Sequence, residues 1–147
     1  MDLQKDFHKY NLITGWGVFL IALLTYGLSV EPTVSFWDCG EYIATSAKLE
    51  VGHPPGAPFF QMVGAFFASF SPSPEKTALF VNYISVFSSA FTILFLYFII
   101  VNFTKKIALT KREALSNSQV IGLYGSGLEG ALAYTFSDSF WFNATET

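Results

Sequence analysis

One stretch decides the fold of this chain: TALFVNYISVFSSAFTILFLYFIIVNFT, residues 77–104, which carries no charged residue over 28 positions. A helix needs roughly 20 consecutive apolar residues to cross about 30 Å of hydrocarbon. The stretch exceeds that length, and its centre is almost entirely aliphatic or Phe. We therefore predict a transmembrane helix over about 78–103.

Two further segments on either side of this stretch are candidates for crossing. Residues 10–30 form an uncharged run of 21 positions, long enough for a first span. Residues 118–136 form a weaker third candidate, because they include several glycines and the acidic Glu129. A charge at mid-bilayer costs roughly 2.5–3.5 kcal/mol on insertion scales, so Glu129 indicates either a paired or functional residue or a span that is drawn too long.

The overall composition supports a membrane protein. Hydrophobic residues make up 52% of the chain, charged residues 13%, and the mean hydropathy is +0.43. The fold class that follows is all-α, with polytopic transmembrane helices. The eight Lys and Arg residues form no long basic face, which excludes nucleic acid as a partner. The single cysteine, Cys39, excludes an internal disulfide and a Cys-rich metal site, and we predict no metal ligands.

The segment between the first two spans is interrupted by prolines at positions 54, 55, 58, 72 and 74. Only residues 57–70 could form an uninterrupted helix. At about 1.5 Å per residue these 14 positions reach only some 21 Å, which suits an interfacial or re-entrant helix better than a crossing.

The positions of the basic residues predict the topology. The positive-inside rule places basic flanks in the cytoplasm, and here they precede the first span and follow the second. Two crossings satisfy the rule, so residues 31–76 form an outer loop and the N-terminus is cytoplasmic. The third span then returns the chain to the outer side. The residues that carry this argument are Lys5, Lys9, Lys105, Lys106, Lys111 and Arg112.

We interpret residues 1–147 as the N-terminal part of one transmembrane domain. Three helices would leave a face of small residues, Gly122, Ser126 and Gly130, with little to pack on. Further helices are therefore expected in a longer protein.

The polar motifs of the outer loop could carry chemistry. Asp38 and Glu41, in WDCGEY (37–42), share one face if this region is helical, and such a pair can serve as base, metal ligand or cation site. They could equally be solvated charges that cap a loop helix. His53, in GHPPGAP (52–58), could orient a phosphate or be a turn residue. The prolines are expected to end a helix over 41–51.

Three motifs together resemble a known family: FWDCGE (36–41), GHPPG (52–56) and FSDSFW (136–141). They resemble the GT-C superfamily of membrane glycosyltransferases, and more specifically the bacterial and animal transmembrane O-mannosyltransferase family. The resemblance covers most of residues 30–147. It implies a polyprenyl-phosphate sugar, such as mannose, as donor and a hydroxyl of an exported protein as acceptor.

The resemblance also implies roles for individual residues. Asp38 matches the first-loop acid that is the candidate catalytic base, and Glu41, His53 and Asp138 are expected to support it or bind substrate. The expected location is a bacterial inner membrane, with the active site on the periplasmic side and a fragment this short inactive alone. Metal dependence stays open.

Two alternatives remain. The sugar acceptor could be a lipid or a glycan instead of a protein. The chain could also belong to a non-catalytic membrane subunit or a transporter, in which Glu129 would matter more than Asp38.

Overall fold

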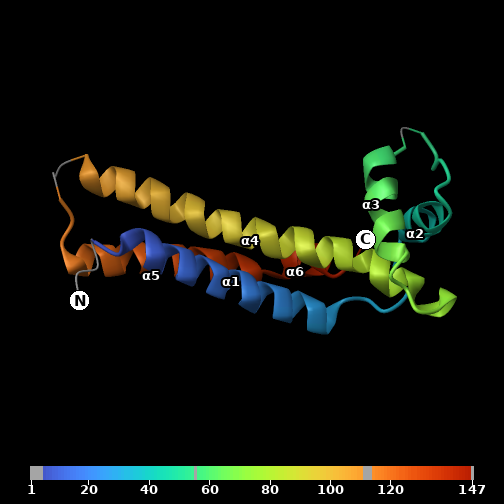
Figure 1. Cartoon of the computed structure of the whole chain (residues 1–147), viewed down its shortest axis with the longest axis horizontal. Helices are drawn as coiled ribbons and strands as arrows, with labels where there is room; N and C mark the ends of the chain where they lie inside the picture. Colours follow the sequence, from blue (N-terminus) through green and yellow to red (C-terminus); the bar gives the residue numbers. More distant parts are fainter. Residues whose placement is uncertain (1–4, 55, 111–113, 147) are drawn as a thin grey trace. The chain divides into compact units, whose positions relative to one another are not determined.

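A computed structural model describes residues 5–54, 56–110 and 114–146, and every regular element within these ranges is helical (Figure 1). The predicted all-α class is therefore confirmed. Pro55, Lys111 and Arg112, which entered the sequence argument, lie outside the described residues. The elements are α1 (Phe7–Ser29), α2 (Cys39–Lys48), α3 (Pro58–Ala68), the 3-10 turn η1 (Pro74–Lys76), α4 (Thr77–Leu109), α5 (Asn117–Thr135) and α6 (Asp138–Ala144).

Two helices in the described part of the chain are long and apolar enough to cross a membrane. They are α1, with 23 residues, and the continuous η1–α4 segment Pro74–Leu109, with 36. The second is longer than the predicted 78–103, because the helix continues through Lys105 and Lys106 at its polar end. The 19-residue α5 confirms a helix near 118–136 but is not apolar enough to meet the same criterion, so a third crossing stays a prediction.

The chain divides into two compact units. Unit 1 comprises Met1–Leu24 and Ala90–Ser137, and therefore contains most of α1, the second part of α4, and α5. A fully buried Tyr97 lies at its centre. Helices approach closely at two glycines: a Cβ on Gly127 would lie 2.5 Å from the Val101 side chain, and one on Gly15 would lie 2.6 Å from the tip of the Phe98 ring.

The small-residue face of α5, expected to have little to pack on among three helices, is open at Gly122 but not at Gly130. Gly122 is exposed, and none of the described atoms would come within 4 Å of a Cβ placed there. Gly130 does approach α4, where an added Cβ would lie 2.6 Å from Ile100, but the tightest position is Gly127. Periodicity identified small residues on α5 but not the side that meets α4, because glycine and alanine also occur outside the predicted face, at Gly127 and Ala131.

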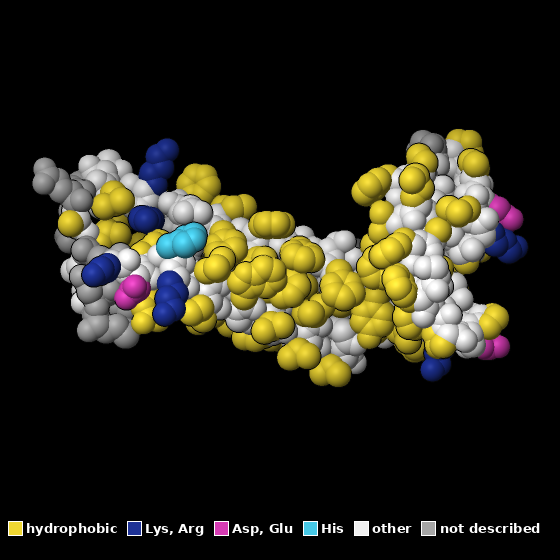
Figure 2. All heavy atoms as spheres, in the orientation of Figure 1, with side chains coloured by type: hydrophobic (Ala, Val, Ile, Leu, Met, Phe, Trp, Pro, Cys, Tyr) yellow, Lys and Arg dark blue, Asp and Glu magenta, His cyan; other side chains and the backbone are white. Residues whose placement is uncertain are grey.

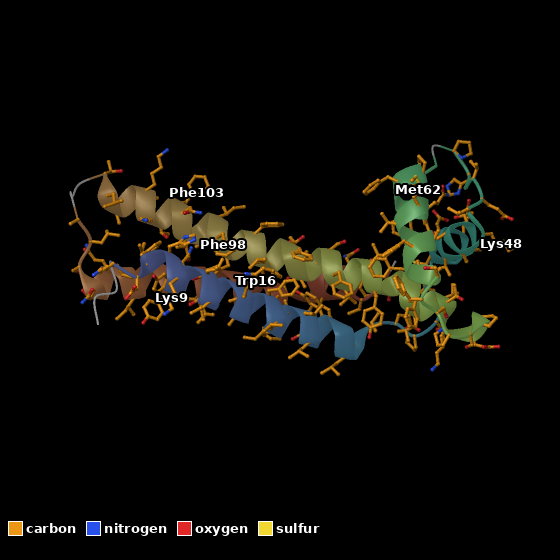
Figure 3. The ribbon with its side chains drawn as sticks, viewed as in Figure 1. Lys9, Trp16, Lys48, Met62, Phe98 and Phe103 are labelled. Atoms are coloured by element: carbon orange, nitrogen blue, oxygen red, sulfur yellow. The ribbon has the colours of Figure 1, made fainter. Side chains whose placement is uncertain are left out.

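The basic flanks of α1 and α4 lie at the same end of unit 1. The Lys105 ammonium lies 4.0 Å from the centre of the Phe7 ring, and the Tyr124 hydroxyl donates to the Phe7 carbonyl at 2.9 Å. Figure 2 shows Lys side chains around this end and hydrophobic side chains along α1 and α4. In Figure 3, Lys9 lies at the same end, and two exposed aromatic residues are labelled on the long helices, Trp16 on α1 and Phe103 on α4. Two antiparallel crossings, as the charge argument requires, would produce this arrangement.

Unit 2 comprises Thr25–Ser89 and Asp138–Thr147. Its buried polar anchor is Asn82 of α4, whose amide donates to the carbonyls of Glu31 at 2.8 Å and Thr33 at 3.1 Å. Buried polar groups are stable only when they are hydrogen-bonded, so this side chain fixes the path of the chain after α1. The motifs of the predicted outer loop all lie in unit 2.

Candidate functional site

Asp38 stands at the N-terminal boundary of α2, where an anion is favoured by the helix dipole. Its side chain makes no capping hydrogen bond to the helix, and its place at the helix N-terminus agrees with the alternative of a solvated charge favoured by the dipole. Two further charges interact favourably with the dipole of α2: Glu41 lies in its first turn and Lys48 in its last, where Figure 3 labels it.

The predicted helix over 41–51 is wrong at both ends. The helix begins at Cys39 and ends at Lys48, because Leu49 adopts a left-handed conformation with φ 54°. The Leu49 and Glu50 amides then bond back to the carbonyls of Ser46 and Thr45, a Schellman type of ending. Backbone geometry, and not the prolines, therefore ends α2.

Helix α2 packs closely on α3 within unit 2 (Figure 1). Gly64 of α3 faces Ser46 of α2 so closely that a Cβ there would lie 2.5 Å from the Ser46 Cβ. Gln61 is buried and donates to the Thr45 hydroxyl at 3.3 Å. The 11 residues of α3 confirm a short helix within 57–70, whereas its place at the membrane interface stays a prediction.

Glu41 and His53 form the best-defined polar pair of the site. One Glu41 oxygen accepts from the His53 backbone N–H at 2.6 Å, and the other lies 2.7 Å from His53 Nδ1. The backbone hydrogen bond, followed by the side-chain one, lowers the pKa of Glu41. The hydrogen bond to Glu41 and its charge raise the pKa of His53. The histidine is therefore paired, which its isolation in the sequence did not indicate.

This pair holds the connection between α2 and α3 that contains His53, called here the His53 loop, against α2. Gly52 allows the approach, because a Cβ there would lie 2.9 Å from Gln61 and 3.2 Å from Glu41. The space left between loop and helix is about 10 Å³, room for about one water molecule. The Glu41–His53 pair therefore holds the loop in place and leaves no room for a substrate between them.

Helix α6 and the residue after it reach the same region through contacts with the end of α1 and with Glu31. The Glu31 amide donates to the Thr145 carbonyl at 2.9 Å, and Trp141 Nε1 donates to the Ser29 hydroxyl at 2.9 Å. Tyr26 and Phe140 pack edge to face with ring centres 6.1 Å apart. These contacts place the end of α6 beside the start of α2.

The result is an open cavity of about 300 Å³ that contains Asp38. Of the described residues, those that line it are Trp37, Asp38, Cys39, Tyr42, Phe142, Asn143 and Glu146. Asp138, the supporting acid expected from the sequence, is not among them and instead begins α6. Glu146, not selected as a site residue from the sequence, shares the cavity with Asp38. The pKa of Cys39 is raised by burial, then by the negative charges of Glu146 and Asp38.

The remaining candidates lie outside this cavity. Glu129 lies on an exposed side of α5 in unit 1, a position that decides neither of its two interpretations. Within the described ranges no group of three or more His, Cys, Asp or Glu side chains could hold a metal ion. The chemistry available in the cavity is a carboxylate base, a second carboxylate, an amide and aromatic rings.

Comparison with known proteins agrees with the motifs. A family model described as the protein O-mannosyl-transferase TMEM260 N-terminal domain matches residues 38–147, beginning at Asp38. The chain belongs to this family. The resemblance to the transmembrane O-mannosyltransferase family is thereby confirmed, and the TMEM260 N-terminal domain contains the whole lining of the Asp38 cavity except Trp37.

One curated relative gives the scale of the match. Protein O-mannosyl-transferase tmem260 of Dictyostelium discoideum is 26% identical over 125 residues, which cover 84% of this chain and 13% of the relative. The chain thus spans a small part of the relative's length. No solved structure matches the chain. The family supports a glycosyltransferase-like role for this TMEM260 N-terminal domain.

Proposed function

We propose that the full-length protein transfers a sugar, mannose by analogy with the family name, from a polyprenyl-phosphate donor to a hydroxyl of an exported protein. The observation that carries the proposal is Asp38. Its carboxylate lines an open cavity of about 300 Å³ and is the first residue of the family match. Transfer takes place on the outer face of the membrane, where the charge pattern places residues 31–76.

The transfer step exchanges one bond to the anomeric carbon for another. The acceptor hydroxyl oxygen attacks this carbon, and the bond from it to the phosphate oxygen breaks. Polyprenyl phosphate leaves with the bonding electrons, and Asp38 accepts the hydroxyl proton. General-base catalysis of this kind is worth about 10²- to 10⁴-fold in rate.

Glu41 and His53 act as positioning residues in this proposal. Their two hydrogen bonds fix the His53 loop on α2, the helix that begins beside Asp38. The negative charge of Asp38 also contributes to raising the pKa of the His53 imidazole. Asp138 supports the site more remotely, as the first residue of the helix that brings Glu146 to the cavity.

The test is Asp38→Asn in the full-length protein, which keeps the side-chain shape but removes its basicity. We expect transfer from polyprenyl-phosphate mannose to an exported acceptor protein to fall by about 10²-fold or more, with normal protein abundance. Asp6→Asn is the matched control, because it makes the same change at an exposed position just before α1. Near-normal transfer by an abundant Asp38→Asn protein would remove Asp38 from catalysis.

The same assay distinguishes the alternative functions. Product analysis shows whether the sugar reaches protein, lipid or glycan. A non-catalytic subunit or transporter predicts no transfer by the wild-type protein, and a greater loss of function from Glu129→Gln than from Asp38→Asn.

A further inference from the structure

The cavity at the start of α2 combines exposed aromatic rings with two carboxylates, and both features require an explanation beyond a single base. We propose that it is the subsite for the sugar ring of the donor, with Trp37 as stacking platform and Glu146 as a second carboxylate that binds sugar hydroxyls. The inference rests on the proposed function and specifies how its site recognises the donor.

Trp37 supplies the apolar side of the subsite. Its side chain is 94% exposed although it lines the cavity, and its backbone φ is +61°. A bulky residue adopts this conformation rarely, and such strained residues are concentrated at functional sites. The face of an aromatic ring carries negative charge density, which attracts the weakly positive C–H groups on one face of a hexose. Tyr42 and Phe142 add further apolar lining.

Glu146 and Asn143 supply the polar side. Both line the cavity with Asp38. The charges of Glu146 and Asp38 both raise the pKa of the Cys39 thiol, so the two carboxylates lie close to the same point of the cavity wall. Carboxylates accept hydrogen bonds from hydroxyl donors and repel anions. The lining therefore suits a neutral polyhydroxylated ring and disfavours the donor phosphate.

The size of the cavity favours the same ligand. Its volume of about 300 Å³ is at the lower end of the range of small-molecule pockets, roughly 300–1,000 Å³. One sugar ring suits this space better than a polyprenyl chain. A ring bound here lies beside Asp38, where its anomeric carbon can meet the acceptor hydroxyl.

Cys39 provides a direct measure of occupancy, because it lines the cavity and can be alkylated. The experiment uses the full-length protein and follows iodoacetamide modification of the Cys39 peptide by mass spectrometry. It compares polyprenyl-phosphate mannose with sugar-free polyprenyl phosphate. At ten times its Kd, the mannose-bearing lipid should slow modification about tenfold, whereas the sugar-free lipid should change it less than about twofold.

Two substitutions test the named residues. Glu146→Gln and Trp37→Ala should each weaken binding of the sugar about tenfold, which lowers protection at the same lipid concentration from about tenfold to about twofold. Trp37→Phe keeps an aromatic face and should retain most of the protection. Glu50→Gln and Phe36→Ala are matched controls, because both are exposed and neither lines the cavity.

Equal protection by both lipids, or by neither, would overturn the inference, as would full sugar-dependent protection in Glu146→Gln and Trp37→Ala. The latter result would leave Trp37 as an anchor at the membrane surface. Failure of the proposed function looks different. If mannose-dependent protection is present but the wild-type protein transfers no sugar, the subsite stands and the transferase reaction does not.

Discussion

Gly64→Ala tests the contact between α2 and α3, on which the orientation of the Asp38 helix depends. The added Cβ would lie 2.5 Å from the Ser46 Cβ, and the Ser46 hydroxyl is closer still. A Cβ cannot rotate away, so the helices must separate. Overpacking of this kind costs about 1–3 kcal/mol, from which about 1 kcal/mol is recovered because alanine favours a helix over glycine. The contact is far shorter than real Cβ atoms show, so the cost lies in the upper part of this range, about 2–3 kcal/mol. The expected net loss is then about 1–2 kcal/mol, a 5- to 30-fold increase in local opening.

Hydrogen exchange measured by mass spectrometry on the full-length protein reports this opening over residues 39–48 and 58–68. Ser46→Gly in the Gly64→Ala background transfers the methyl-sized group from one helix to the other and should restore most of the protection. Gly125→Ala is the matched control, because the described atoms leave open space around that helical glycine and the change should be stabilising. Unchanged exchange in Gly64→Ala, or no rescue by Ser46→Gly, would refute the close contact.

Three further predictions concern the positioning pair, α5 and the topology. The raised pKa of His53 means that its charged pairing with Glu41 is complete below the ordinary histidine value of 6.5 and is lost as pH rises through the higher folded value. The activity profile should therefore have an alkaline limb that His53→Gln removes; an unchanged limb would contradict this role. Gly127→Ala should destabilise the α4–α5 contact in a thermal unfolding assay, and equal or higher stability would be the contrary result. In intact cells an impermeant thiol reagent should label Lys48→Cys but not Lys106→Cys, each made in a Cys39→Ser background, and the reverse pattern would invert the topology.

The Glu41 side of the pair has the opposite pH dependence. Its pKa is lowered, so its contribution is complete above the ordinary glutamate value of 4.5 and is lost as pH falls through the lower folded value. Both groups are exposed, so screening by solvent and salt limits what the pair adds to overall stability. Its main effect is on the position of the His53 loop.

The sequence by itself determined the long apolar helices and the family. Hydropathy is a local property, so the long run at 77–104 and the run at 10–30 predicted α4 and α1 directly. The prolines limited the segment between them to a short helix, found as α3. The motifs around Asp38 and His53 identified the family because they are contiguous.

Only the tertiary structure decided which polar residues meet. Glu41 pairs with His53 through a turn whose course depends on the left-handed Leu49 and on the close approach at Gly52. Glu146 joins Asp38, while Asp138 does not line the cavity, because hydrogen bonds from Trp141 of α6 to Ser29 at the end of α1, and from the Glu31 amide to the Thr145 carbonyl, hold the residues that follow α6 beside the start of α2. These contacts join positions that are distant along the chain. Local patterns carry no information about such pairings, because they depend on which distant hydrogen-bonding groups the folded chain brings together.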